Sequence, residues 1–413
     1  MDLSKRNNLK NEVSNLIEEL SEYGKTENNG ITRTLFSDIW MDTQKFLESE
    51  MVKRGFKTRF DEVGNLYGMV KGTEQATETI MVGSNIDTVV GGGRLDGQLG
   101  IVSGIIAIEK LVEEFGVPKK NLEIVSMAEE EGSRFPYTFW GSKNIVGTVS
   151  KEEVEKLVDH DGVSFAEAMK GKGFDFKNEN AVIRDDIKAY LELHIEQGGV
   201  LEKEGKPIGL VNSIVGQKRF LIEVEGESNH AGTTPMSYRR DSLHGAAKMI
   251  DSIIELSKEY GDPLVATVGR LDVVPNTSNV VPGKVVFSVD TRHTNNEVVS
   301  DFISKFKASI ESIANEMNLK IKIDQYMDGY PVPMDEDLIN KMEKICLAKE
   351  LDYKIMHSGA GHDAQIFAPK IPTALIFVPS RKGISHSYLE FTDPEDYVYG
   401  VELLKEMFYD LAY

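Results

Sequence analysis

The chain has 413 residues, of which 40% are hydrophobic and 28% charged, a composition that allows two or three folded domains. A formal net charge of −20 argues against nucleic acid as a partner. The chain has one cysteine, so no intrachain disulfide can form. Residues 1–6 lack the apolar core of a signal peptide. No apolar run is long enough for a membrane span, so we expect a cytoplasmic protein.

Strand-like and helix-like segments alternate in the first half of the chain. Residues 101–115 have a helical pattern that ends at a helix stop, and Ser150 to Glu153 has the pattern of a capping box opening a short helix. This alternation favours an α/β sheet with helices on both faces. The predicted strands of this part are 65–70, 79–83 and 122–127.

The segment 213–328 has a different pattern. Its order of strands and helices is βαββαβ, which is that of a ferredoxin-like unit. Strands and helices then resume, with a strand at 373–378. We therefore expect a small domain inserted into a larger one. The predicted strands of the insert are 219–225, 264–274, 284–290 and 319–324, and its helices are 241–256 and 299–317.

Carboxylates and an amide follow the strand at 79–83. Asn85 and Asp87 are one residue apart, so on a strand they would face the same side. Asp87 could then accept a hydrogen bond from a neighbouring ligand. Asp96 follows in a glycine-rich turn, and its two oxygens could bridge two metal ions. Taken alone, the Asp96–Gly97 pair also fits a simple turn.

Three glutamates, 129–131, follow the apolar strand at 122–127. Acidic runs usually mark solvated surface. Here the run ends a buried strand, where α/β sheets carry their sites. One carboxylate could bind a metal ion while its neighbour takes a proton from water.

The histidines and the remaining polar residues are less specific. His194 and His386 could be metal ligands, although a lone histidine is more often a structural hydrogen-bonding residue. Arg292 could clamp a carboxylate or form a surface ion pair, and Asn279 could be only a turn residue. From these residues, a metal-dependent hydrolase is the favoured class and the substrate stays open.

Four longer runs, 127–137, 192–198, 226–236 and 356–369, carry a resemblance. On them the chain resembles, essentially end to end, the M20-type metallo-amidohydrolases that cleave carbamoyl and ureido groups. Within this family it looks most like the members that act on allantoate. The resemblance implies an α/β/α catalytic domain with a mixed central sheet at 1–212 and 329–413. It also implies a ferredoxin-like lid at 213–328 that forms a homodimer.

The resemblance also implies a site. It implies two divalent cations, Mn²⁺ before Zn²⁺, and a small ureide substrate. Asp96 would bridge the cations, with Glu131 and His386 on one and His194 on the other. Glu130 would be the general base. Oxyanion stabilisation and substrate binding would fall to His230, Gln217, Asn279, Arg292 and Gly361, with Arg292 on the substrate carboxylate.

One position departs from the family pattern. The family has histidine, a ligand of the second metal, where this chain has Asn85. A neutral amide oxygen suits hard ions and binds zinc-like metals poorly. We therefore expect a weakened second metal site and, with it, impaired turnover.

The favoured hypothesis is hydrolysis of the ureido C–N bond of allantoate in purine degradation, which gives ureidoglycine, ammonia and carbon dioxide. One alternative is an N-carbamoyl-L-amino-acid hydrolase that uses the same metals and Arg292. Another, which Asn85 favours, is a catalytically silent ureide-binding protein. An aminopeptidase fits less well, because Arg292 suits a small carboxylate better than a peptide chain.

Overall fold

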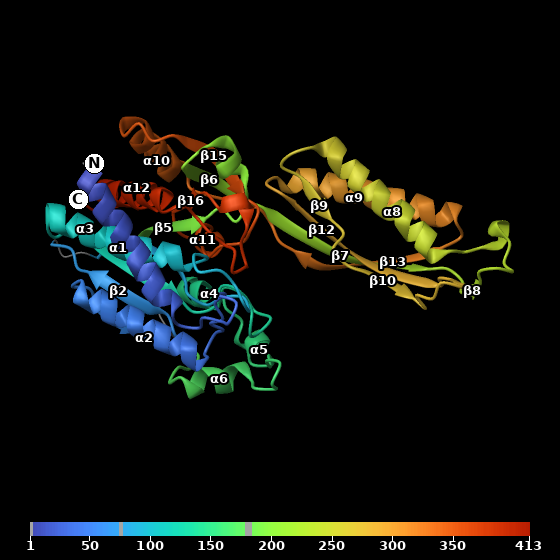
Figure 1. Cartoon of the computed structure of the whole chain (residues 1–413), viewed down its shortest axis with the longest axis horizontal. Helices are drawn as coiled ribbons and strands as arrows, with labels where there is room; N and C mark the ends of the chain where they lie inside the picture. Colours follow the sequence, from blue (N-terminus) through green and yellow to red (C-terminus); the bar gives the residue numbers. More distant parts are fainter. Residues whose placement is uncertain (1–2, 74–76, 178–183) are drawn as a thin grey trace. The chain divides into compact units, whose positions relative to one another are not determined.

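The computed structural model describes residues 3–73, 77–177 and 184–413. Met1 and Asp2, part of the N-terminal segment interpreted above, lie outside the described residues. The chain folds as two compact units. The large unit comprises Met1–Asn212 and Pro333–Tyr413, and the inserted unit comprises Ser213–Val332. Figure 1 shows the helices and strands of each.

The large unit is built on one mixed sheet, which has nine strands among the described residues. Eight of them follow one another in the order β1-β2-β4-β3-β5-β16-β6-β14, and the ninth, β15, pairs with β6. The neighbours β4, β3, β5 and β16 run parallel, while β2 and β6 pair antiparallel with β4 and β16. The prediction of an α/β fold with a mixed central sheet is confirmed. Parallel strands end at one edge of a sheet, so the residues that follow these four strands are brought together.

The elements of the large unit agree with the apolar runs of the sequence. Its strands are β1 (Lys57–Phe60), β2 (Leu66–Val70), β3 (Thr79–Asn85), β4 (Asn121–Met127), β5 (Ile187–Ile195), β6 (Ile208–Ile214), β14 (Val332–Pro333), β15 (Tyr353–Ser358) and β16 (Thr373–Val378). Its helices are α1 (Leu3–Ser21), α2 (Asp38–Lys53), α3 (Gln98–Phe115), α4 (Trp140–Val146), α5 (Lys151–Val154), α6 (Phe165–Gly171), α7 (Val200–Glu204), α10 (Glu336–Ala348), α11 (Ala364–Phe367), η2 (Arg381–Gly383) and α12 (Pro394–Ala412). Among the helices that the structure describes, none is both long and apolar enough to cross a bilayer.

Strand β5 shows how the two faces of this sheet differ. Successive side chains of a strand point to opposite faces. Leu193 packs on one face against α12, where a Cβ added at Gly400 would lie 2.8 Å from its Cδ1. Tyr190 points to the other face and stacks on Phe367 of α11 at 4.1 Å between ring centroids. His194, in the same alternation as Tyr190, therefore lies on the α11 face of the sheet.

Two local predictions for the large unit are wrong. Ser150 precedes α5 but makes no capping hydrogen bond to the helix backbone, because its hydroxyl lies 3.4 Å from the Glu152 carboxylate instead. The capping box is at Ser164 and Glu167, which begin α6. Strand β3 ends at Asn85, so Asp87 lies beyond the strand in a loop.

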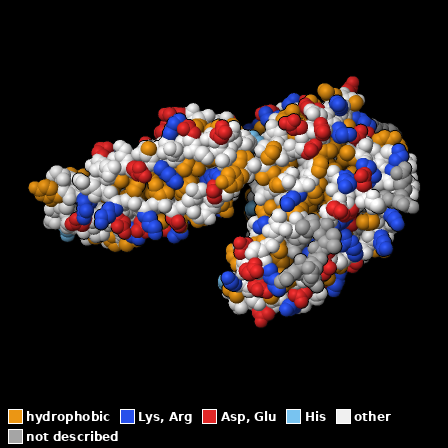
Figure 2. Space-filling model, turned by 180° about the vertical axis from the view of Figure 1, so that it is seen from behind, with side chains coloured by type: hydrophobic (Ala, Val, Ile, Leu, Met, Phe, Trp, Pro, Cys, Tyr) orange, Lys and Arg blue, Asp and Glu red, His pale blue; other side chains and the backbone are white. Residues whose placement is uncertain are grey.

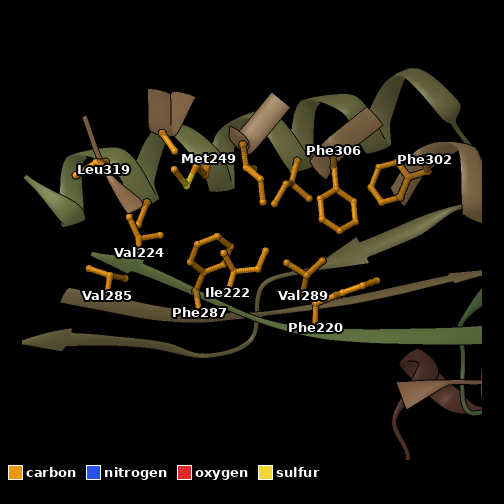
Figure 3. Packing of buried hydrophobic residues seen from close by; sticks show 14 of the residues in the cluster. Phe220, Ile222, Val224, Met249, Val285, Phe287, Val289, Phe302, Phe306 and Leu319 are labelled. Carbon is orange, nitrogen blue, oxygen red and sulfur yellow. The ribbon is translucent and has the colours of Figure 1, made fainter. Parts of the chain in front are cut away.

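The inserted unit is a layer of two helices on an antiparallel sheet with strand order β10-β12-β7-β13 and β9 paired to β12. Burial alternates along β7 and β12, which explains why one face of this sheet carries the core (Figure 3). That core joins Phe220, Ile222, Phe287, Met249 and Phe306. The elements are β7 (Gly216–Glu225), β8 (Asn229–His230), η1 (Met236–Tyr238), α8 (Ser242–Tyr260), β9 (Val265–Thr267), β10 (Leu271–Val274), β11 (Val280–Val281), β12 (Lys284–His293), α9 (Asn296–Glu316) and β13 (Lys320–Asp328).

The strands of the inserted unit differ from prediction at two places. The run 264–274 is not one strand but two, β9 and β10, which pair with different parts of β12. Strand β12 continues to His293, so Arg292 lies on the strand and not after it. The continuation is stabilised by pairing of Arg292 with Gln217 and of His293 with Gly216 on β7.

Candidate metal centre

The candidate site lies where the parallel strands of the large unit end. Asp96 lies between β3 and α3, and Glu131 follows β4. His194 is near the end of β5, and His386 is in the loop between η2 and α12, after β16. Gly97 shapes the turn after Asp96: its φ is +64°, and a Cβ there would lie 2.4 Å from Asn85 Oδ1. Only glycine meets both requirements at once.

The carboxylate of Asp96 lies between two histidines. Its Oδ1 is 3.0 Å from Nε2 of His194, and its Oδ2 is 3.2 Å from Nε2 of His386. The second oxygen also accepts hydrogen bonds from Gln197 Nε2 at 2.8 Å and from the Ser385 hydroxyl at 3.0 Å. Each oxygen thus faces a different imidazole, which is the arrangement that a carboxylate bridging two cations requires.

His194 is held in an orientation that suits a metal ligand. Its Nδ1 donates to the carbonyl oxygen of Ile195 at 2.9 Å. In the neutral ring, Nε2 accepts from the backbone N–H of Gly97 at 3.2 Å; in the protonated ring, Nε2–H donates to Asp96 Oδ1 at 3.0 Å. A backbone partner on one ring nitrogen is the usual way a protein orients the other nitrogen for a metal ion.

The donor set fits a divalent cation. Asp96, Glu131 and His386 each offer one ligand atom, and these three atoms lie within 4.8 Å of one another. Carboxylate oxygens with imidazole nitrogen suit Mn²⁺ and Zn²⁺. These residues would hold one cation, and His194 with the other oxygen of Asp96 would supply half of a second site. The side chain of His386 is 50% exposed, so this site is open to solvent.

Asp87 and Glu129 fix the loop that carries the other two glutamates. Asp87 Oδ2 accepts from the backbone N–H groups of Glu130 and Glu131, at 3.0 and 3.1 Å. Glu129, at φ +62°, accepts from the backbone N–H of Gly132 at 2.5 Å. Asp87 was expected to support a neighbouring ligand. In the structure it accepts from the backbone N–H of Glu131, one of the proposed ligands.

The charges of the metal-free cluster shift its pKa values. Although burial opposes it, hydrogen bonds from His194 and His386 hold the pKa of Asp96 well below its usual range. The same carboxylate raises the pKa of His386 to about 9, and it overcomes burial to raise that of His194 to about 9. Burial and the negative charge of Asp96 raise the pKa of Glu131 to about 8. Burial, followed by the charge of Glu131, raises the pKa of Glu130 well above normal.

These shifts predict that metal binding depends steeply on pH. With folded-state pKa values of about 9 for both histidines and about 8 for Glu131, all three ligands are mainly protonated at neutral pH, and a cation must displace those protons. We expect the Kd for Mn²⁺ to fall at least about tenfold per unit between pH 6.5 and 8, since each displaced proton contributes a factor of ten. Calorimetric titration in two buffers of different ionisation enthalpy measures the proton release. A Kd that is flat across this range would contradict the proposed ligand set.

Asn85 is buried beside this cluster, with 2% of its surface exposed. Its Nδ2 donates to the carbonyl oxygen of Asp87 at 3.2 Å, and its Oδ1 accepts from the Ser84 hydroxyl at 3.3 Å. The amide is therefore engaged in local hydrogen bonds. One lone pair of Oδ1 is left for a cation, which makes it a weaker ligand than an imidazole nitrogen.

The other predicted residues belong to the inserted unit and form two groups. Gln217 and Arg292 are paired neighbours on β7 and β12 and both bind Asp290: Gln217 Nε2 lies 2.6 Å and Arg292 Nε 3.0 Å from its carboxylate oxygens. The ion pair considered as an alternative for Arg292 is therefore present. His230 and Asn279 are neighbours at β8 and β11, where the backbone N–H of Ala231 donates to Asn279 O at 3.0 Å.

The sequence analysis missed several residues that surround the cluster. Gln197 and Glu390 were not singled out, although Gln197 lies in the run 192–198. Gly361 was chosen from its run, but it is exposed, whereas its neighbour His362 is buried and lies edge-on to His194 at 4.5 Å between ring centroids. Burial and the positive charge of His194 lower the pKa of His362 well below normal, so that ring is neutral.

Together, a mixed α/β sheet and a carboxylate–histidine cluster at its parallel strand ends define a hydrolase with a candidate metal centre. Residues 77–410 match the family model described as peptidase family M20/M25/M40, and the chain belongs to this family. It is an amidohydrolase of that family, as its curated relatives indicate.

Several curated relatives match nearly the whole chain, among them two amidohydrolases. An allantoate amidohydrolase of Escherichia coli (strain K12) is 50% identical over 394 residues, which are 95% of this chain and 96% of the relative. An N-carbamoyl-L-amino-acid amidohydrolase of Pseudomonas sp. (strain NS671) is 38% identical over 395 residues, covering 94% of this chain and 95% of the relative. The crystal structure of an amidase of the hydantoinase/carbamoylase family from Burkholderia multivorans matches with a TM-score of 0.91 at 30% identity, over 96% of each chain.

Proposed function

We propose that this protein hydrolyses the ureido C–N bond of allantoate to ureidoglycine, ammonia and carbon dioxide, with Mn²⁺ at the Asp96 cluster. The observation that carries the proposal is the Asp96 carboxylate held between His194 and His386, next to Glu130. The 50% identity to an allantoate amidohydrolase supports allantoate as the substrate. A bound divalent cation supplies a Lewis acid that polarises the ureido carbonyl and lowers the pKa of water.

We assign Glu130 the proton transfer of this reaction. Asp87 holds its backbone N–H, and burial beside Glu131 raises the pKa of its carboxyl group well above normal. In the proposed reaction it takes the proton of the attacking water and then delivers it to the leaving nitrogen. A carboxyl group with a raised pKa holds a proton more readily, which suits a group that both accepts and donates it.

His230 has the hydrogen-bonding pattern of an oxyanion donor. Its Nδ1 accepts from the backbone N–H groups of Gly232 and Thr233, at 3.0 and 3.2 Å. The ring proton of the neutral imidazole is therefore on Nε2. His230 is exposed, so Nε2–H can donate to the oxygen on which negative charge develops, a contribution of about 3 kcal/mol in comparable sites.

Arg292 is the proposed partner of the substrate carboxylate. Arg219 and Arg292 both form an ion pair with the carboxylate of Asp290, so two guanidinium groups lie on this end of the sheet. Although burial opposes it, Arg292 lowers the pKa of Asp290, so that carboxylate stays ionised and orients the guanidinium.

The substitution Arg292→Lys is expected to raise KM for allantoate at least about tenfold with kcat changed little, because lysine cannot reproduce bidentate binding to a carboxylate. Steady-state kinetics measures KM and kcat separately. Arg270→Lys is the matched control, since Arg270 pairs with Asp272 in the same unit and has no proposed substrate role. An unchanged KM in Arg292→Lys would remove Arg292 from the substrate site.

We propose that the inserted unit is a ferredoxin-like lid and that it forms a homodimer. Arg292 lies eight positions along β12 from Lys284, which follows β11, and at roughly 3.3 Å per residue this is about 26 Å. A small ureide cannot span that length, so His230 and Arg292 of one chain serve different sites. Exposed apolar side chains that a second copy could cover include Leu271 and Val274 of the edge strand β10. Figure 2 shows the mixture of apolar and charged side chains on one face.

A mixture of two inactive variants tests this proposal. Glu130→Gln removes the base of its own chain, and His230→Ala removes the donor that would serve the partner. If each site uses His230 of the other copy, randomly mixed dimers regain about a quarter of the wild-type activity. No recovery, in a mixture shown by native mass spectrometry to contain mixed dimers, would place His230 in the site of its own chain.

A second activity has support, and one assay separates the two. Similarity to an N-carbamoyl-L-amino-acid amidohydrolase favours that activity as the second candidate. Ammonia release from allantoate and from N-carbamoyl-L-methionine, each with Mn²⁺, decides between the two hydrolases. Membership of an amidohydrolase family argues against the catalytically silent binding protein considered from Asn85.

A further inference from the structure

A buried carboxylate outside the proposed ligand set joins the two loops that carry Asp96 and His386. Glu390 is 4% exposed and lies four residues after His386. Its Oε1 accepts from the backbone N–H groups of Leu95 and Asp96, at 2.8 and 3.0 Å. A Cβ added at Gly93 would lie 2.1 Å from the Glu390 carboxyl group, so the loop before Asp96 passes directly over it.

The second carboxylate oxygen of Glu390 is linked to Asp96 and to the loop of His386 through the hydroxyl of Ser385. The Ser385 hydroxyl lies 3.0 Å from Glu390 Oε2 and 3.0 Å from Asp96 Oδ2. Its single proton can bond only one of them at a time. Ser385 directly precedes His386, which has a φ of +56°. One carboxylate thus contacts the backbone of Asp96 and, through one hydroxyl, both the carboxylate of Asp96 and the loop of His386.

We propose that Glu390, acting through Ser385, is a positioning residue that fixes Asp96 and His386 relative to one another for cation binding. The two ligands come from different loops, and neither loop is a helix or a strand that would hold its own geometry. This inference depends on the proposed metal site but not on allantoate as the substrate. It therefore stands or falls separately from the proposed reaction.

The experiment is a Mn²⁺ titration of chelator-treated protein, with the Kd as readout. Glu390→Ala removes every contact that the Glu390 carboxylate makes, and changes of this kind beyond the ligands weaken metal affinity about 10- to 100-fold. Glu390→Gln removes the charge but keeps an oxygen for the two N–H groups and adds an amide N–H for Ser385. We expect Glu390→Ala to bind Mn²⁺ at least about tenfold more weakly than Glu390→Gln.

Asp159→Ala is the matched control for a general loss of loop stability. Asp159 is also a buried carboxylate that accepts from two backbone N–H groups, those of Asp161 and Val163, but it contacts none of the proposed ligands. We expect it to lower the Tm of the metal-free protein as Glu390→Ala does, with the Kd for Mn²⁺ unchanged. The visible spectrum of bound Co²⁺, which reports coordination geometry, should change in Glu390→Ala alone.

Three outcomes would overturn the proposal. Equal Mn²⁺ affinity in Glu390→Ala and wild type would show that the contacts do not position the ligands. Equal loss in the alanine and glutamine variants would show that only the charge matters. Equal loss in Asp159→Ala would show a general effect of instability. If Glu390→Ala does not fold, Ser385→Ala decides, since it removes the hydroxyl between Glu390 and Asp96, together with one hydrogen bond from Gln197, and leaves the Glu390 contacts with the backbone in place. The proposal then requires a weaker Kd for Mn²⁺ with a wild-type Tm.

Discussion

Glu130→Gln is expected to lower kcat for allantoate by about 10²- to 10⁴-fold, the range usual for loss of a general acid–base group. The amide keeps the size of the side chain and the backbone hydrogen bond to Asp87, but it cannot take a proton from water. Glu130 is absent from the group whose ligand atoms lie within 4.8 Å of one another, so we expect the Kd for Mn²⁺ to stay near the wild-type value.

The stability of the same variant shows whether lost activity means lost structure. Burial and the charge of Glu131 raise the pKa of Glu130 in the folded protein. A raised carboxyl pKa means that ionisation costs stability as pH rises above the unfolded-state value. Glutamine removes that cost, so the Tm of metal-free Glu130→Gln at pH 8 should equal or exceed that of wild type. Activity within tenfold of wild type, in correctly folded and metal-loaded protein, would exclude Glu130 as the base.

Asn85→His is expected to add a second tightly bound Mn²⁺ per chain and to raise kcat/KM for allantoate at least about tenfold, since even outer-shell changes at metal sites have effects of 10- to 100-fold. An imidazole nitrogen replaces an amide oxygen that is already engaged by Ser84. Asn85 is buried next to Gly97, which directly follows Asp96, so a side chain at this position is close to the Asp96 carboxylate.

Metal analysis after dialysis against low micromolar Mn²⁺ measures the stoichiometry. Asn85→Leu is the control, because it fills a similar volume without a ligand atom and should leave the metal count at the wild-type value. Two equivalents in the wild-type protein, with no gain in Asn85→His, would contradict the expected weakness of the second site. No ammonia release in either protein would reject allantoate as the substrate.

Continuous apolar runs explain why part of this architecture could be predicted. A strand buried on both faces is mostly apolar, so residues 122–127 were recognisable as a strand, despite Glu123 and Ser126, and the glutamates after it as its end. The local sequence pattern predicted the bounds of a strand wrongly where pairing with a distant strand sets those bounds. The break between β9 and β10 and the extension of β12 to His293 both follow from the ladder on β12, which no local pattern contains.

The amino-acid sequence by itself determined which strands are buried, that an α/β sheet forms, and which acidic and histidine residues follow those strands or occur in the runs typical of the family. Only the tertiary structure decided that Asp96 lies between His194 and His386, that Asp87 binds the backbone of Glu131, and that Glu390 binds the backbone of Asp96, 294 residues away. The physical reason is that burial and periodicity are local properties of a chain. Distances between side chains depend on strand register and loop conformation, which are set by contacts between residues remote in sequence.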